Sequence, residues 1–253
     1  MARKFSFGNS NPVMSRIGKM AEEHSFANTS DAPMTLEGTI NKSLILIGIL
    51  IITASFTWNM ATTNPSQAGA LMLGGMIGGL IVALIVIFKS ELAPKLAWLY
   101  AALEGLFLGG VSAKYAAIYE GIVFQAVGLT MLTLALMLLL YRNEIIKVTD
   151  KFRSTIVAAT LGIVVFYVLT WILGMFGFNI PGVFDGGLMS IGISLFIVVI
   201  AALNLLLDFD MIEKGIEAKA PNYFEWYAGF SLLITLVWLY VELLRLLSYL
   251  SND

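Results

Sequence analysis

The sequence predicts an all-α integral membrane protein with seven transmembrane helices. Of its 253 residues, 58% are hydrophobic and 13% are charged, and the mean hydropathy is +0.86. Soluble domains contain about 25% charged residues, so this chain has too little polar surface to cover its apolar surface in water. The apolar residues also gather in seven long runs, and Lys and Arg alternate between the gaps. These observations exclude soluble enzymes, nucleic-acid-binding proteins and disordered scaffolds.

Each apolar run is close to the roughly 20 residues that cross a bilayer. Gly and Pro residues separate the runs, and the predicted spans are 43–60, 68–88, 96–117, 121–141, 155–177, 187–209 and 226–250. Residues 1–40 are polar and lack the apolar core of a signal peptide. We therefore expect a mostly disordered tail over 1–40, with a short helix around 13–23, and a membrane domain over 41–253.

The loop charges predict the orientation of the chain. Thirteen of the 15 Lys and Arg residues fall in the tail, at the entry to the first span, or in the gaps after spans two, four and six. On the opposite side the only basic residue is Lys114, near the end of the third predicted span, and Arg245 lies within the last span. Because cytoplasmic loops carry an excess of Lys and Arg, we expect the N-terminus in the bacterial cytoplasm and the C-terminus outside the cytoplasmic membrane.

The residue inventory excludes several kinds of chemistry. The chain has no cysteine and one histidine, His24, in the polar tail. Thiolate sites, membrane zinc proteases with an H-E-x-x-H helix, Ser–His proteases and haem ligation by histidine therefore cannot be built. A net charge of −2 offers no basic face for nucleic acid. We expect neither an enzyme nor a resident cofactor.

Small residues predict close helix packing in two spans. The second span carries two overlapping G-x-x-x-G patterns, in Gly74, Gly75, Gly78 and Gly79. Gly105 and Gly109 repeat the spacing in the third span. Small residues at this spacing let helix backbones approach each other within lipid, so tight packing is the expected role of these glycines.

The last span carries a polar stripe. Ser231, Thr235, Trp238, Glu242 and Arg245 are spaced by 4, 3, 4 and 3 residues, which places them on one helix face. The other positions are nearly all Leu, Ile and Val, so this face must contact protein or water. We therefore predict that the last helix is central in the bundle. Glu242 and Arg245 can form an ion pair, whose role is either structural or part of a transport pathway.

Ionisable residues at membrane depth are functional candidates because burying them is costly. Asp208 ends the sixth span one turn after Asn204, whereas Asp210 points about 200° away, toward headgroups or a loop. At about 1.5 Å per residue, Glu104 and Thr235 lie roughly 12 and 13 Å from the inner ends of their helices. Asp208 and Glu104 can therefore meet near the cytoplasmic side, with Thr235 beside them. Two such carboxylates could share a proton, or bind a hard cation such as Ca²⁺ when ionised.

At these residues the sequence resembles the bacterial branch of the Bax-inhibitor (transmembrane Bax-inhibitor-motif) family. The resemblance rests on AALEGLFLGG (101–110), RSTIVAATLGIVVFYV (153–168), LNLLLDFDMIEKG (203–215) and PNYFEWYAGFSLLITLVWLYVELLRLL (221–247). It implies six helices wrapped around a central seventh. It also implies a pH-sensitive Ca²⁺ leak that is controlled by two aspartates, one late in the sixth helix and one in the seventh.

The resemblance places the first of these aspartates at Asp208, with Asp210 as the alternative. For the second, an alignment on the Leu-Leu-Arg that ends at Arg245 places Thr235 at the position, whereas an alignment on Leu-Tyr at 239–240 places Glu242 there. The first alignment matches more residues and gives the expected depth. This chain then lacks the second aspartate, and the two-carboxylate gate is either missing or rebuilt from Asp208 and Glu104.

Three functional hypotheses follow. The first is a pH-sensitive cation leak channel for Ca²⁺, gated by the buried carboxylates near the cytoplasmic side. The second is a non-transporting regulatory protein that binds another membrane protein, such as a membrane protease. The third, a proton-coupled transporter, would usually show broken helices in paired repeats, and no such repeat is evident. In each case the expected surroundings are the lipid bilayer, with Ca²⁺ or H⁺ as the ion.

Overall fold

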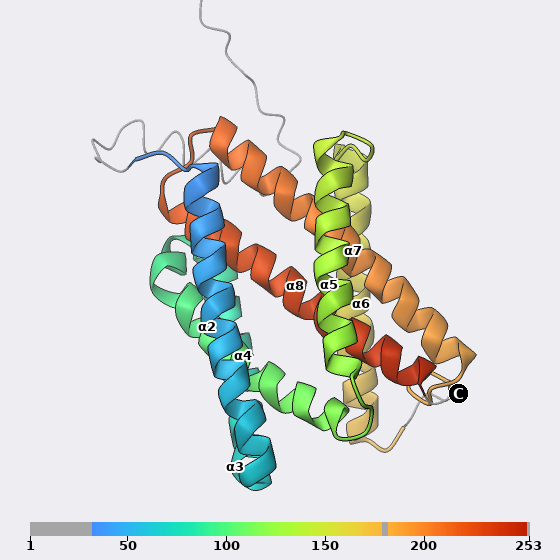
Figure 1. Ribbon diagram of the computed structural model, residues 1–253. Coiled ribbons are helices and arrows are strands. Elements are labelled where there is room, and N and C mark those ends of the chain that lie inside the picture. Colours follow the sequence, from blue (N-terminus) through green and yellow to red (C-terminus); the bar gives the residue numbers. More distant parts are fainter. Residues whose placement is uncertain (1–31, 179–181, 252–253) are drawn as a thin grey trace, which may run out of the picture.

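The computed structural model describes residues 32–178 and 182–251, and these ranges contain seven helices that are long and apolar enough to cross a membrane (Figure 1). The helices are α2 (Leu36–Thr63), α3 (Pro65–Phe88), α4 (Ala93–Ala116), α5 (Ile122–Arg142), α6 (Asp150–Met175), α7 (Leu188–Glu217) and α8 (Tyr223–Leu250), with a short 3₁₀ turn, η1 (Ser90–Leu92), before α4. The predicted seven-helix membrane fold is confirmed, because each predicted span coincides with one of these helices.

Several helices extend beyond the apolar runs, and local capping explains where they begin. Thr35 caps α2 by accepting a hydrogen bond from the Gly38 amide, and Thr149 caps α6 in the same way. The helix α2 thus starts within the range assigned to the tail, and α7 continues eight residues past the predicted end at 209. The helix expected around 13–23 lies outside the described residues.

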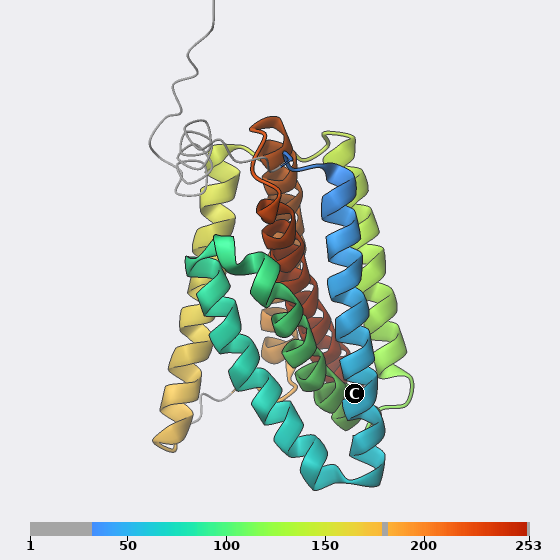
Figure 2. The same ribbon diagram turned by 90° about the vertical axis from the view of Figure 1, so that its left-hand side faces the viewer.

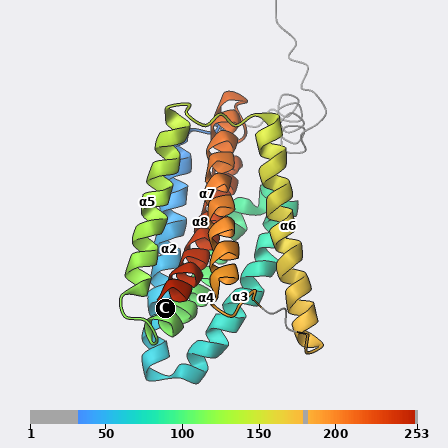
Figure 3. The same cartoon turned by 90° about the vertical axis from the view of Figure 1, so that its right-hand side faces the viewer.

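The last helix is central, as the polar stripe predicts. In its most apolar window, 56% of the α8 residues are buried by protein, compared with 11% for α2 and for α6. The helix α8 packs on α2, α4, α5 and α7, whereas α3 packs mainly on α4 and α6 packs on α7. Figure 2 shows α3 and α4 side by side, and Figure 3 shows α7 flanked by α5 and α6. The membrane-facing sides of the outer helices are correspondingly apolar and exposed.

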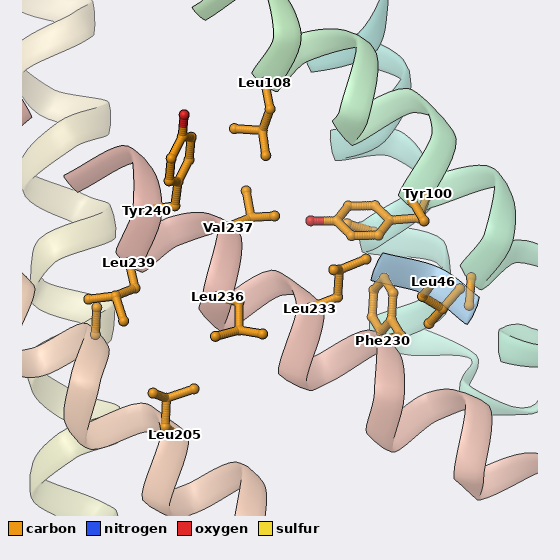
Figure 4. Close-up of a cluster of buried hydrophobic side chains, with 14 of the residues drawn as sticks. Leu46, Tyr100, Leu108, Leu205, Phe230, Leu233, Leu236, Val237, Leu239 and Tyr240 are labelled. Carbon is orange, nitrogen blue, oxygen red and sulfur yellow. The ribbon is translucent and has the colours of Figure 1, made fainter. Parts of the chain in front are cut away.

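The core surrounds α8 and contains mainly aliphatic side chains (Figure 4). Leu233, Leu236 and Val237 of α8 are buried in it, together with Leu205 of α7. The ring of Tyr100 on α4 packs edge-on against Phe230, with 4.9 Å between the ring centres, a favourable aromatic geometry. This core fixes the positions of the polar groups that α8 presents to its neighbours.

Candidate functional site

Asp208 lies in the interface between α7 and α8 and is 6% exposed. One carboxylate oxygen, Oδ1, accepts a hydrogen bond from the Ser231 hydroxyl at 2.7 Å. The other oxygen, Oδ2, is buried and has no hydrogen-bond partner. No ion pair in the described part of the chain involves Asp208. An ionised carboxylate in this position would lack the charge partner that buried ions normally require.

Thr235 lies one helical turn beyond Ser231 and is also buried. Its hydroxyl donates a hydrogen bond to the Ser231 carbonyl at 3.3 Å, and the side chain lies close to the Asp208 carboxylate. The structure therefore brings together three of the predicted residues, one from α7 and two from the stripe on α8. We refer to Asp208, Ser231 and Thr235 as the inner cluster.

Glu104 does not join the inner cluster. Its carboxylate lies beside Gly79 of α3 and interacts with the hydroxyl of Tyr100, one turn earlier on α4. Tyr100 in turn packs against Phe230 of α8, whereas Asp208 contacts the adjacent residue, Ser231. The Glu104 carboxylate thus lies between α3 and α4, whereas the Asp208 carboxylate lies between α7 and α8. Across the residues that the structure describes, no group of three or more His, Asp or Glu side chains could hold a metal ion.

Asp210 is buried, contrary to the prediction that it points toward headgroups or a loop. It is 6% exposed and forms ion pairs with Arg153 of α6 and with Lys214, one turn later on α7. Both aspartates lie on the helix α7, but the start of α6 covers the side of α7 that carries Asp210 and supplies Arg153. Asp210 therefore links α6 to α7, and its charge is neutralised within the protein.

The outer part of the stripe forms a second polar cluster, which contains the expected pair of Glu242 and Arg245 at 3.4 Å. Glu242 is 1% exposed and also accepts hydrogen bonds from Ser194 of α7 at 2.8 Å and Tyr167 of α6 at 3.1 Å. Arg245 additionally donates to the Tyr167 hydroxyl and lies over its ring. Trp238, the remaining stripe residue, packs with the apolar residues between α6 and α7. This outer cluster joins three helices.

A comparison with known protein families shows to which family the chain belongs. The chain matches the family described as Bax inhibitor 1 like over residues 11–252. It belongs to this family. None of the curated proteins matches it significantly. The resemblance in the sequence is thereby confirmed, and it extends over the whole membrane domain of this Bax inhibitor 1 like protein.

Sequence reasoning missed one buried charged residue of this family member. Glu225, near the start of α8, is paired with Lys42 of α2 and accepts hydrogen bonds from the amide and hydroxyl of Thr35 at 2.7 and 2.9 Å. Asn222 also donates to it, at 3.3 Å. Glu225 lies just before the predicted span at 226, so the apolar pattern does not mark it as a residue of the membrane domain's core. Its partners show that it ties the start of α2 to the start of α8.

Proposed function

We propose that this Bax inhibitor 1 like protein is a pH-sensitive cation leak channel, with Ca²⁺ as the principal ion, and that the protonation of Asp208 gates it. The observation that carries the proposal is the buried carboxylate of Asp208, which has one hydrogen bond and no basic partner in the described structure. Ionisable residues that are retained inside membranes without a charge partner commonly mark ion or proton pathways.

The protonation state of Asp208 would control the α7–α8 interface. When the carboxyl group is neutral, it can remain buried at low cost. When it is ionised, Oδ2 needs water or a cation, and either one must separate α7 from α8 locally. We therefore expect the closed state at acidic pH and a larger leak as the pH rises.

The inner cluster has the chemistry for transient binding of a hard cation. Asp208, Ser231 and Thr235 offer carboxylate and hydroxyl oxygens, the ligand type that Ca²⁺ prefers. Tight Ca²⁺ sites use six to eight oxygen ligands, and this cluster supplies fewer. Weak binding suits conduction, because an ion must leave the site as readily as it enters.

The described structure fits a closed pathway. About 16 Å along α8 separate Ser231 from Glu242, as judged from the helical rise per residue. Between these two polar clusters, the fully buried side chains of Leu205 and Leu239 fill the α7–α8 region. Opening would require these apolar contacts to separate. Loop charges favour an orientation with the inner cluster near the bacterial cytoplasm and the outer cluster near the opposite surface.

The test is Ca²⁺ entry into proteoliposomes between pH 5 and pH 8. Wild-type protein would be compared with Asp208→Asn, which mimics the neutral carboxyl group. A matched control is Asp150→Asn, because Asp150 is exposed at the start of α6. We expect a flux that rises with pH in the wild type and the control, and a low, pH-independent flux in Asp208→Asn.

Two results would count against the proposal. A pH-dependent flux that persists in Asp208→Asn would place the gate elsewhere, with Glu104 as the next residue to test. No flux at any pH, from folded protein in the vesicles, would favour a regulatory membrane protein that acts through a partner.

A further inference from the structure

A deep apolar cleft lies between α2 and α5 and reaches the central helix. Its walls come from α2, α4, α5 and α8, and its volume is about 310 Å³, within the range of sites that bind small molecules. The helix α2 packs on α4 and α8, whereas α5 packs on α7 and α8. The cleft exists because these two outer helices share α8 as a neighbour and diverge around it. Leu236 and Val237, which are buried in the core, form part of its floor.

The lining of the cleft selects an apolar occupant. No Asp, Glu, Lys or Arg lines it. The hydroxyl groups at its floor already have partners, since Ser112 and Tyr240 are hydrogen-bonded to each other at 2.6 Å and Thr130 donates to a carbonyl of its own helix. Because the lining has no charged side chain and these hydroxyl groups already hydrogen-bond within the protein, the cleft favours an apolar occupant over a charged one.

The dimensions of the cleft match one leaflet of a bilayer. Its α2 wall runs from Ile47 to Trp58, which corresponds to about 16 Å of helix. This length is half of the roughly 30 Å hydrocarbon core. Trp58 lies five residues before the end of α2, at the level where aromatic side chains commonly meet the headgroup region. An acyl chain whose headgroup lies near Trp58 would thus span the cleft.

The mouth of the cleft opens onto the lipid-facing surface. Ile51 of α2 and Met131 of α5 line the cleft and are 56% and 47% exposed. Both lie within membrane-spanning helices, so their exposed surface faces the hydrocarbon of the bilayer. The molecule available at this mouth is a membrane lipid, and its chain can enter sideways without leaving the bilayer.

We propose that this cleft binds one acyl chain of a bilayer phospholipid, which packs against α8 between α2 and α5. The chain would come from the leaflet on the side where α2 ends and α5 begins. It would fill the space between α2 and α5, and so complete the packing around the central helix.

Photolabelling of the unmodified protein tests the proposal. The protein would be reconstituted in dioleoyl phosphatidylcholine vesicles that contain a phosphatidylcholine with a diazirine in its acyl chain. Because Leu236 and Val237 are buried, ordinary surrounding lipid cannot reach them. We expect labelling at these positions and none at Leu239 and Leu244, which are also buried on α8 but do not line the cleft. Labelling restricted to the exposed faces of the helices would overturn the proposal.

A cleft-filling variant provides the second test. Ser55 and Thr130 line the cleft, and each hydroxyl donates to a carbonyl of its own helix, so Ser55→Leu with Thr130→Leu adds volume without breaking a contact between helices. The matched control is Thr155→Leu with Thr170→Leu on α6, where both hydroxyls also bond within the helix. Neither of these two positions lines the cleft.

Native mass spectrometry of the purified proteins would count retained lipid. We expect one tightly held dioleoyl phosphatidylcholine in the wild type and the control, and at least a tenfold lower lipid-bound fraction in the cleft-filling variant. Circular dichroism would verify that all three proteins are folded. Equal retention in the folded variants, or retention of added oleic acid but not of phospholipid, would refute the proposed occupant.

Discussion

Adding a single methyl group at Gly75 should separate α3 from α4, whereas the same change at the adjacent Gly74 should not. A Cβ atom at Gly75 would meet the backbone of α4 at the carbonyl oxygen of Leu103, and would lie 2.8 Å from the amide nitrogen of Phe107. Backbone atoms cannot rotate away as a side chain can. At Gly74, a Cβ atom has no neighbour within 4 Å.

The expected magnitude follows from the cost of overpacking. An extra methyl group in a tightly packed interface costs about 1–3 kcal/mol. The gain in helix propensity from Gly to Ala, at most about 1 kcal/mol, applies to both variants and cancels in their comparison. For a chain of this size, about 1 kcal/mol shifts the melting temperature by roughly 2–4 °C. Gly75→Ala should therefore melt roughly 2–12 °C below Gly74→Ala.

Thermal unfolding in detergent, followed by intrinsic fluorescence, measures this difference. The two variants carry the same substitution at neighbouring positions of one helix, so differences in expression or detergent binding largely cancel. Equal melting temperatures would show that the close approach of α3 and α4 is not a source of stability, and that Gly75 does not have the packing role inferred from the structure.

Two further predictions concern the ion pairs. Arg153→Met leaves the buried Asp210 with Lys214 as its remaining basic partner, and should lower the free energy of unfolding by about 1.5–3 kcal/mol, the range for a hydrogen bond to a charged group. Lys147→Met breaks an exposed pair and should cost less than about 1 kcal/mol. Chemical denaturation in detergent measures both changes. Arg245→Met leaves the buried Glu242 carboxylate without a basic partner and should lower the melting temperature strongly. Adding Glu242→Leu to this variant should restore most of the lost stability. A double variant as unstable as the single one would refute the assigned pairing.

The sequence was sufficient to predict the membrane fold because apolar runs and loop charges depend on the bilayer rather than on detailed packing. The ends of the helices were less predictable. Caps such as Thr35 and Thr149 lie in polar sequence outside the hydrocarbon region, so a search for apolar runs begins each helix too late. The central position of α8 was predictable because a polar stripe on an apolar helix has to face other helices.

The arrangement of the site was only partly predictable. Helical periodicity correctly grouped the polar residues of α8, and Asp208 faces two of them. Periodicity gives the angle between two residues of one helix but not which neighbour covers each side, and the prediction for Asp210 was wrong for this reason. The depth of a residue likewise gives its position along the membrane normal, but not which neighbouring helix its side chain faces. Glu104 therefore matched Asp208 in depth while it faces α3.

The link between Asp208 and the leak can be tested most directly by measuring protonation and flux in the same vesicles. Infrared difference spectroscopy would follow the C=O band of protonated carboxyl groups as the pH is raised, and Asp208→Asn would identify the contribution of Asp208. The account predicts that this band disappears with the same pH midpoint as the rise in Ca²⁺ flux, and that both changes are absent in Asp208→Asn. An unchanged flux midpoint in Asp208→Asn would contradict it.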